Sequence, residues 1–377
     1  MEAIVLNASF EVVRVIDAFD NFIWTDRYSS YGDFELYIPL TEENVDGLLD
    51  EVDGYCYIAI QDSEHVMVIE DIQIDSESGD EAQLQVTGRS MESILDRRII
   101  HNQLIFLEDE SNPNQTNFQN VIKTILNSNV ISPDDEERKI DILDFEESTD
   151  EAITSLTLSA QAPRGAYVYD VIKSFCESNN VGFRITLSDG PRLKFKLYSG
   201  VDRSYDQDLN SYVVFAPNFD NLLNSSYLKS KRNYKNVALV LGPGNESERK
   251  AFFVKSSDGI TGLDRREMCV EAQDISQTVD GQTLSDEEHT TLLTERGNSK
   301  LTESTVVESF EGEADPRSTF KYGTQEEVRD GAADYSMGDI VQIENEYGIK
   351  SRSRVTEIVR SESSSGFEMY PTFTKIK

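Results

Sequence analysis

The stretch Asp334-Tyr335-Ser336-Met337-Gly338-Asp339-Ile340-Val341, near the C-terminus, carries the clearest structural signals of the chain. Met337-Gly338-Asp339 has the composition of a turn, and Ile340-Val341-Gln342-Ile343-Glu344 that of a strand. Glu346-Tyr347-Gly348 then turns the chain again. The sequence therefore predicts a strand enclosed by two tight turns.

Two more extended runs follow this strand. Residues 352–360 form the first run, 361–366 a polar turn, and 367–373 the second run. In the second run Phe367, Met369 and Phe373 share a face by period two. Three short strands of this kind form a meander that needs a larger sheet to bury its apolar face. We therefore expect the C-terminal region to be part of a larger β structure.

Charge is the most informative property of the composition. The 377 residues include 70 acidic and 35 basic side chains, which gives a net charge of −35 spread over the whole chain. Such a chain repels nucleic acid and anionic membranes at long range, so we expect no specific nucleic-acid binding. Two interpretations stay open: the acidity is a solubility feature of the surface, or part of it lines a passage through which DNA moves.

The remaining composition describes a folded chain without membrane or disulfide signals. No run of about 18 apolar residues exists, and the N-terminus lacks a basic segment, so we expect no membrane insertion and no signal peptide. Cys56, Cys176 and Cys269 lie far apart among apolar residues. We expect them to be buried, reduced thiols of a protein made in a cytoplasm.

Residues 1–100 are interpreted as a first β-barrel domain, because short strands alternate with turn signals about every dozen residues. Thr41 is placed to cap a short helix after the strand that Pro39 ends, and Ser90 to cap another after the last strand. The expected strands cover 10–17, 22–28, 34–38, 56–60, 66–74 and 83–87.

Residues 101–211 are interpreted as a mixed α/β domain with two helices and a hairpin. Thr116-x-x-Gln119 has the pattern of a capping box that opens the first helix, and Asp170 begins the second. The apolar stripe of the first helix consists of Phe118, Val121, Ile122, Ile125 and Leu126.

The hairpin of this middle domain is the clearest local pattern. Phe183, Ile185 and Leu187 share one face, Asp189-Gly190 makes the turn, and Leu193, Phe195 and Leu197 return on the same face. The alternate residues of the returning strand form a basic row that points outward. Two interpretations stay open: a solvated strand face, or a surface that meets an acidic partner. The basic row consists of Arg192, Lys194 and Lys196.

Residues 212–377 are interpreted as a second β-barrel domain with an inserted helix at 285–297. A strand over 234–241 ends in the tight turn Gly242-Pro243-Gly244, and further strands follow. Ser285-x-x-Glu288 is a capping box, and Gly297 is the expected C-terminal stop of the helix. Its apolar side is thin, which suits a helix on a surface or against a neighbouring subunit.

No motif in the sequence clearly indicates a catalytic or metal-binding site. His65, His101 and His289 are scattered, without a metalloprotease or zinc spacing, and no nucleophile-elbow motif exists. Clustered oxygens at 134–137 and 344–346 lack the spacing and glycine of a calcium loop, so solvated acidic loops are the better interpretation. We expect no catalytic, cofactor or metal residues and no enzymatic activity.

Several short segments, spread over nearly the whole chain, carry a resemblance to a known family. They are Trp24-Thr25-Asp26-Arg27-Tyr28, 31–36, 88–98, Lys235-Asn236-Val237-Ala238, Gly242-x-Gly244, Arg265-Arg266-Glu267, 334–341, 345–349, 354–358 and Tyr370-Pro371-Thr372-Phe373. In this order they resemble segments of phage tail baseplate hub and tail-tip proteins, including those of siphophages.

The resemblance implies a mainly β fold with two tail-tube-like barrels, a mixed α/β domain between them, and a helix inserted in the second barrel. It also implies a homotrimeric, pseudo-hexameric ring in the virion that joins the tail tube or distal tail protein to the central spike or tip protein. Such a ring surrounds the channel for DNA and the tape measure protein. Two alternatives stay open: a receptor- or carbohydrate-binding tail module and, less favoured, a cell-wall hydrolase.

Overall fold

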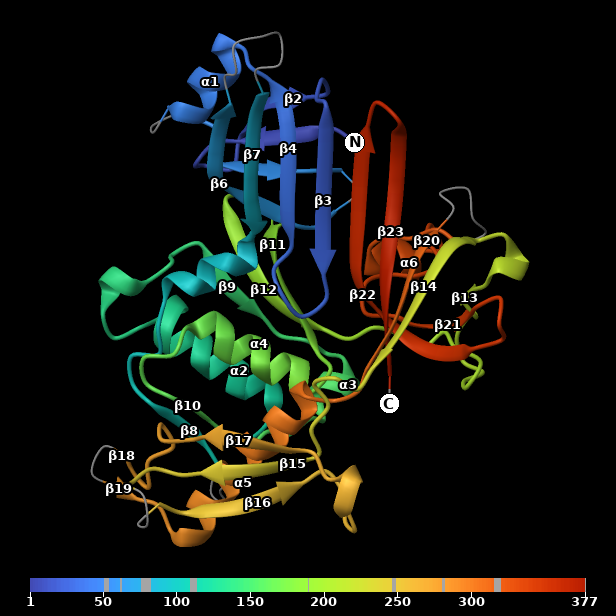
Figure 1. The fold of residues 1–377 in the computed structure, drawn as a ribbon. Coiled ribbons are helices and arrows are strands. Elements are labelled where there is room, and N and C mark those ends of the chain that lie inside the picture. The colour runs from blue at the N-terminus through green and yellow to red at the C-terminus, as the bar shows by residue number, and fades with distance from the viewer. Residues whose placement is uncertain are drawn as a thin grey trace.

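One open β-sheet dominates the computed structural model of the chain (Figure 1), in which residues 1–50, 54–61, 63–75, 83–108, 114–188, 190–245, 249–279, 282–314 and 320–376 are described. Thirteen strands join in this sheet. The main path runs β14-β20-β23-β22-β3-β4-β7-β6-β5-β1-β2, and β13 and β21 extend it beside β22.

The N-terminal strands form half of this sheet because their apolar residues alternate. In β4 (Asp33–Pro39), Phe34, Leu36 and Ile38 are buried while their neighbours are partly exposed. These side chains pack with Phe22 and Trp24 in one core cluster. The other elements are β1 (Ala3–Leu6), β2 (Val12–Ile16), β3 (Asn21–Arg27), α1 (Glu42–Leu49), β5 (Tyr57–Ala59), β6 (Val66–Asp75), β7 (Gln83–Ser90) and the 3-10 helix η1 (Met91–Arg97).

The C-terminal meander forms the other half. The turn, the strand and the two extended runs predicted from 337 to 373 are present, and Phe373 is fully buried in their core. The two long strands, β22 and β23, extend into the predicted polar turn at 361–366, because β22 ends at Ser363 and β23 begins at Gly366. The elements are β13 (Val214–Phe215), β14 (Leu222–Ser230), β20 (Val307–Ala314), α6 (Gln325–Arg329), β21 (Ile340–Glu344), β22 (Lys350–Ser363) and β23 (Gly366–Lys375).

The two halves meet directly. Strand β22 pairs antiparallel with β3, with Glu357 opposite Arg27 and Ser363 opposite Asn21. The end strands of the path, β2 and β14, do not pair with each other in the described part of the chain. The expected mainly β fold is therefore confirmed, but its strands form one open sheet here and not two closed barrels. Strand patterns alone do not show which distant strands become neighbours, so the β3–β22 junction was missed.

The middle of the chain packs a three-stranded sheet, β11-β12-β9, against helices α2 and α4. The predicted hairpin register is confirmed: Phe183 lies opposite Leu197, and Ile185 opposite Phe195. Asp189 of the predicted turn lies outside the described residues. The elements are β8 (Leu104–Phe106), α2 (Phe118–Leu126), β9 (Leu143–Glu146), α3 (Glu151–Thr154), β10 (Ala160–Ala162), α4 (Val168–Ser178), β11 (Gly182–Ser188) and β12 (Arg192–Tyr198).

The capping box predicted for the first helix of this region is wrong. Asn117 is the N-cap of α2, and its side chain accepts a hydrogen bond from the Asn120 N–H at 3.2 Å. Gln119 instead accepts from the Ser148 N–H at 2.7 Å. Asn is at least as good an N-cap as Thr, so the helix begins one residue later than the motif indicated. Helix α4 begins at Val168, two residues before the predicted Asp170.

A segment between two neighbouring strands of the large sheet forms its own unit. Strands β14 and β20 pair with each other, with Ser230 opposite Val307, although about 75 residues separate those two positions. The intervening chain lies beside α2 and α4, away from β22 and β23 (Figure 1). It contains β15 (Val237–Leu241), β16 (Ala251–Lys255), β17 (Glu267–Glu271), β18 (Thr278–Val279), β19 (Gln282–Thr283) and α5 (Asp286–Glu303).

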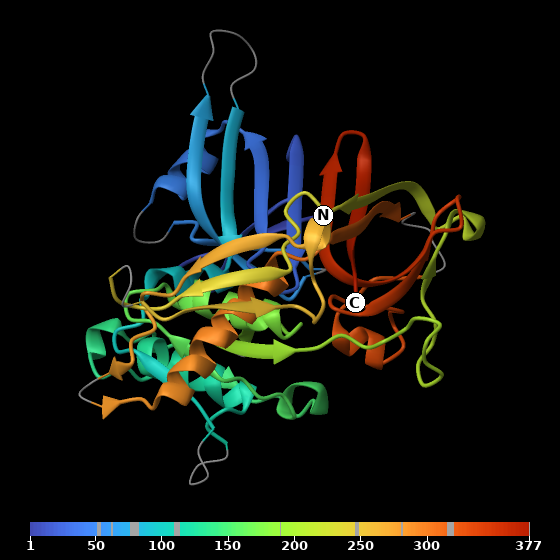
Figure 2. The ribbon, with the colours of Figure 1, turned by 60° about the horizontal axis from the view of Figure 1, so that its bottom comes forward.

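Helix α5 lies on the sheet β16-β15-β17 (Figure 2), and the predicted capping box of Ser285 and Glu288 is confirmed. The helix does not stop at Gly297. A Cβ atom there would come within 2.8 Å of Val240 and Val254, so glycine allows close packing against β15 and β16. Leu292, Leu293 and Leu301 are buried in the same core. The thin apolar side of the helix is thus covered by this chain.

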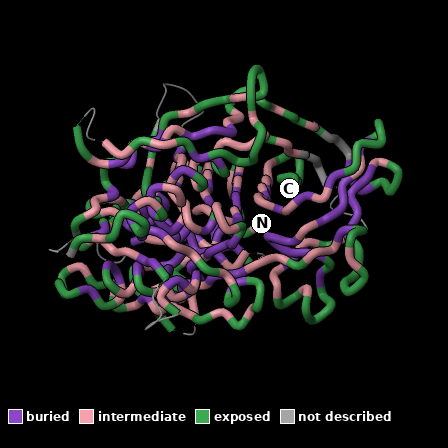
Figure 3. The backbone as a smooth tube through the Cα atoms, turned by 90° about the horizontal axis from the view of Figure 1, so that it is seen from below, coloured by how far each residue is buried: buried purple, intermediate pink, exposed green. Residues whose placement is uncertain are grey.

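Two surface expectations change as well. The basic row is paired within the chain: Arg192 contacts Asp144 at 2.6 Å, and Lys194 and Lys196 contact Glu146. These ion pairs form because β9 runs parallel beside β12. The basic row is therefore occupied within the chain, and it no longer favours an acidic partner surface. Of the three free cysteines, Cys176 is buried, Cys56 is half-buried and Cys269 is exposed on β17. Figure 3 shows the buried segments inside the fold and the exposed ones around its outside.

The hairpin register leads to a first prediction. Phe195 is fully buried and stacks between Phe145 and Phe183, with ring centroids 5.8 Å apart in both pairs. Phe195→Asp places an unpaired carboxylate in this core and should lower the free energy of unfolding by about 4 kcal/mol or more. Urea unfolding measures this change in the free energy of unfolding. Lys194→Ala, on the outward face of the same strand, should cost under about 1 kcal/mol. Equal stability of the two variants would contradict this register.

Candidate functional site

A buried ion pair joins the two halves of the sheet. Asp26 on β3 lies beside Arg360 on β22, with Oδ2 and Nη1 separated by 2.6 Å. Both residues are buried, at 3% exposure each. Trp24 Nε1 donates to Asp26 at 2.8 Å, and the Ser63 hydroxyl donates at 3.0 Å. Burial alone would raise the pKa of Asp26, but Arg360 and His65 hold it below its usual value. Asp26 is therefore an ionised, fully bonded carboxylate.

A second buried pair ties the N-terminal half of the sheet to β11 of the middle region. His65 Nδ1 lies 3.2 Å from Oε1 of Glu92, which is fully buried in η1. Glu92 also accepts a hydrogen bond from the Ile185 N–H of β11 at 2.6 Å and from the Ser90 hydroxyl. Burial would lower the pKa of His65, yet the carboxylate of Glu92 raises it to about 9. His65 is therefore charged at neutral pH.

The hydroxyl of Ser90 does not cap η1 as predicted. It accepts a hydrogen bond from the Gly32 N–H at 2.8 Å and donates to Glu92. The hydroxyl of Ser90 therefore orients the carboxylate of Glu92, which bonds β11, and does not cap the helix.

Arginine and tyrosine side chains close the junction between the three regions. Arg184 contacts Glu64 at 2.5 Å, and its guanidinium lies over the Tyr198 ring, 4.7 Å from the centroid. Arg360 lies over Tyr322 at 5.3 Å. The space left between these groups is about 20 Å³, enough for a water molecule and too small for a substrate. The junction therefore fixes the relative position of the three regions.

The two end strands of the large sheet form a second candidate feature. On β2 the side chains of Val12, Val13 and Val15 are 63%, 42% and 47% exposed. At the other end of the sheet Leu228 on β14 and Val307 on β20 are each 50% exposed. In the described residues β2 pairs only with β1, and β14 only with β20. An apolar edge strand without a neighbour is a ready surface for pairing with another chain.

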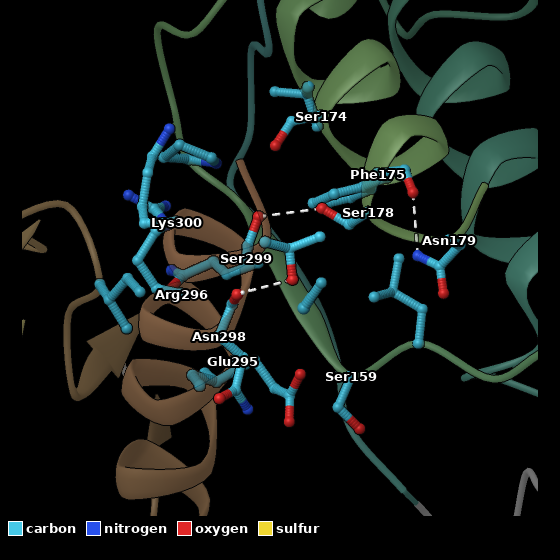
Figure 4. A pocket seen from close by; sticks show the side chains of 18 of the residues that line it. Ser159, Ser174, Phe175, Ser178, Asn179, Glu295, Arg296, Asn298, Ser299 and Lys300 are labelled. Atoms are coloured by element: carbon cyan, nitrogen blue, oxygen red, sulfur yellow. Dashed lines mark hydrogen bonds between the residues drawn. The ribbon is translucent and has the colours of Figure 1, made fainter. Parts of the chain in front are cut away.

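A groove between α4 and α5 is the third feature (Figure 4). Its volume is about 440 Å³, within the range of ligand sites. The Ser178 and Ser299 hydroxyls, 3.1 Å apart, join the two helices across it, and the Ser174 hydroxyl lies 3.4 Å from Glu303. The wall beside the helices is β10, which contributes Ala160 and Gln161.

The acidic clusters considered for calcium stay apart from these features. Within the described ranges, no three His, Cys, Asp or Glu side chains come together as a metal site. Asp135 caps the short 3-10 helix η3 (Glu136–Arg138) by accepting from the Glu137 N–H. Asn345, in the other cluster, accepts from the Tyr347 and Ile349 N–H groups of a turn. No helix in the described part of the chain is long and apolar enough to cross a membrane.

Sequence reasoning missed the junction, although one signal for it exists. Phe22, Trp24 and Asp26 share one face of β3 by period two, so a carboxylate sits where an apolar side chain is expected. A charged residue on a buried face requires a buried partner. The sequence alone does not say that the partner is Arg360, more than 300 positions away.

Comparison with known proteins agrees with the resemblance seen in the sequence motifs. A family model described as Siphovirus ReqiPepy6 Gp37-like protein matches residues 2–374. No curated protein matches the chain. The tail protein from Neisseria meningitidis MC58 is 13% identical, with a TM-score of 0.56, over 99% of this chain and 95% of that one. The 43 kDa tail protein of prophage MuSo2 from Shewanella oneidensis is 10% identical, with a TM-score of 0.56, over 100% and 98%. At such identities the likeness shows the fold alone, and it agrees with the expected tail-protein fold but not with the two expected barrels.

The Asp26–Arg360 pair leads to a second prediction, tested by a double-mutant cycle. Arg360→Met leaves a buried carboxylate without its cation and should lower the free energy of unfolding by about 3–5 kcal/mol. Asp26→Asn combined with Arg360→Met should be less destabilising than the sum of the single changes. The exposed Arg192–Asp144 pair is the matched control, with a coupling under about 1 kcal/mol. Additive effects at Asp26 and Arg360 would disprove the coupling.

The His65–Glu92 pair leads to a third prediction, on pH dependence. The pKa of His65 is raised from its ordinary value of 6.5 to about 9. Its contribution to stability is therefore complete below pH 6.5 and is lost as the pH rises through 9. Over this window the wild type should lose about 1–3 kcal/mol more than His65→Gln in urea unfolding. His101→Gln, at an exposed histidine, should follow the wild type. A His65→Gln profile parallel to that of the wild type would contradict a charged His65.

Proposed function

Because this chain belongs to the Siphovirus ReqiPepy6 Gp37-like protein family and has the fold of prophage tail proteins, we propose that it is a baseplate hub or tail-tip protein. In this proposal three copies form a ring in the tail tip of a virion or of a related contractile particle. The ring joins the tail tube, or a distal tail protein, to the central spike or tip protein. It surrounds the channel for DNA and the tape measure protein.

The observation that carries this proposal is the open sheet, whose two end strands each have only one strand neighbour in the described residues. Strand β2 ends the sheet with exposed valines, and β14 ends it beside the exposed Leu228. The two edges differ, so the β2 edge of one copy meets the β14 edge of the next. Such a head-to-tail contact generates a closed ring when the rotation between copies closes. Edge pairing between copies also covers both apolar edges.

The two strand groups of each chain would be the tube-like elements of this ring. The N-terminal group ends at β3, and the C-terminal group begins at β22. Three chains would then supply alternating N-terminal and C-terminal groups around one barrel, with pseudo-sixfold symmetry. This ring meets a hexameric tube on one side and a trimeric spike on the other. In this proposal neither strand group closes into a barrel within its own chain. Each group is instead completed by the strands of a neighbouring copy.

The buried junction supports this role because a ring closes only at a fixed angle. Asp26 and Arg360 bridge the two groups within each chain, and both are fully desolvated. Breaking such a pair leaves an uncompensated buried charge, so sliding of β3 along β22 is strongly disfavoured. The angle between the two groups is therefore built into the monomer.

The acidic composition suits a passage for a polyanion. A net charge of −35 per chain repels DNA from surfaces that it passes at close range. At physiological ionic strength the Debye length is about 8 Å, so only carboxylates close to the lumen act on the DNA. This role needs no catalytic group, and we propose that the protein is structural and not an enzyme.

A fourth prediction tests the ring through its edge. Val13→Lys combined with Val15→Lys adds two charges to the exposed side of β2 and should change the stability of the monomer by less than about 1 kcal/mol. Native mass spectrometry of the wild type with its tube or spike partner should give three copies of this chain per complex. The double variant should lose that stoichiometry because two lysines cannot pack against the next copy.

The matched control is Leu263→Lys. Leu263 is fully exposed in the turn η6 (Gly262–Asp264), outside the large sheet, so this variant should assemble like the wild type. A one-to-one complex of the wild type with its partner would overturn the ring. Normal assembly of the Val13/Val15 variant would place the ring contact elsewhere than β2.

A further inference from the structure

The groove between α4 and α5 contains a buried amide with no partner. Gln161 on β10 lines the groove, and only 5% of this residue is exposed. Neither its Nε2 donor nor its Oε1 acceptor makes a hydrogen bond in the described part of the chain. Buried polar groups are nearly always bonded, and an unbonded one lowers stability. A carboxamide kept in this state suits a ligand that supplies both an acceptor and a donor.

The rest of the groove combines an apolar floor with polar walls. Val171 and Phe175 of α4 face the groove from one side, and Leu292 of α5 from the other. The labelled serines of both helices line the same space, with Ser178 and Ser299 bonded across it (Figure 4). Apolar floors with a few placed polar groups are typical of sites that bind a specific ligand.

The charges of the groove favour a cation. Arg296 and Lys300 of α5 are engaged by Asp274 and Glu303. Asp170 and Glu295 line the groove from α4 and α5, and no ion pair of either is found in the described residues. Burial raises the pKa of Glu295, and a hydrogen bond from Asn298 partly opposes this rise.

One edge of β10 has no strand partner in the described chain. In the described chain β10 pairs with β8 alone, with Gln161 opposite Ile105. The residues that line the groove include Ser159, Ala160 and Gln161, which belong to this strand or directly precede it. An extended peptide can add to such an edge, with main-chain hydrogen bonds for affinity and side-chain pockets for specificity.

We propose that this groove binds an extended peptide segment of another polypeptide that carries a lysine or arginine side chain. The carboxamide of Gln161 donates to a main-chain carbonyl of the peptide and accepts from a main-chain N–H. The basic side chain lies between Asp170 and Glu295. The groove is separate from β2 and β14, so this binding does not depend on the ring.

The test uses the full-length protein and capped peptides as probes. Acetyl-Ala-Lys-Ala-Ala-amide is titrated against protein labelled on its glutamine side chains, and the Gln161 amide resonance is followed by NMR. A saturating shift at millimolar peptide is expected, because a short segment gains little binding energy. Acetyl-Ala-Glu-Ala-Ala-amide should bind roughly tenfold more weakly or worse. No shift with the lysine peptide, or a shift with a neutral chitin oligosaccharide instead, overturns the proposal.

Two variants separate binding from folding. Gln161→Met has nearly the same volume and removes the unpaired amide, so its melting temperature should be equal to or above that of the wild type. Its affinity for the lysine peptide, followed through the resonances of other groove residues, should fall roughly tenfold. Glu295→Gln should lose the preference for the lysine peptide over the glutamate peptide.

The matched control is Gln342→Met. Gln342 is also a buried glutamine, but its amide donates to the Ile343 and Ser351 carbonyls at 3.4 and 3.3 Å. This variant should melt at a lower temperature and bind the peptide like the wild type. If Gln161→Met loses as much stability as Gln342→Met, the Gln161 amide is bonded in the free protein and the proposal fails. Unchanged peptide affinity in Gln161→Met also refutes it.

Discussion

The arrangement of this chain depends on a desolvated ion pair between strands that lie at opposite ends of the sequence. Asp26 and Arg360 hold β3 against β22, and the pair makes one sheet of two strand groups. A buried pair contributes little net energy compared with apolar packing, but it penalises every arrangement in which the partners separate. Its effect is on geometry: the two groups keep one register and one angle. His65 and Glu92 do the same between the first group and β11.

Local patterns in the sequence were reliable wherever a periodicity and a neighbouring turn coincided. The hairpin from Phe183 to Leu197 was placed in its correct register because both strands alternate and the turn is short. The Ser285–Glu288 capping box is recognisable because its members lie three residues apart, and each side chain accepts a hydrogen bond from the backbone N–H of the other residue. The tail-protein resemblance rests on the same kind of local signal, and the family match agrees with it.

The features that sequence reasoning missed depend on contacts between distant segments. Gly297 reads as a helix stop, but Val240 and Val254 lie so close that only glycine fits in the middle of α5. The basic row beside Phe195 reads as a free surface until β9 brings Asp144 and Glu146 next to it. Gln161 gives no signal at all in the sequence, because an unpaired amide can be recognised only once its surroundings are known. For Gly297 and for the basic row, the deciding contacts come from residues far away along the chain.

The position of the inserted unit has a consequence for how such proteins diversify. It leaves the large sheet at Ser230 and returns at Val307, two residues that face each other across one strand pair. Its ends are therefore close in space, and its core of β15–β17 and α5 also packs against Ile105 and Leu107 of the middle region. A segment whose ends lie this close can be replaced by another without changing the strand order of the sheet. The exchange would replace one wall of the α4–α5 groove and leave the other, so lineages can acquire new contacts at the groove while the sheet stays constant.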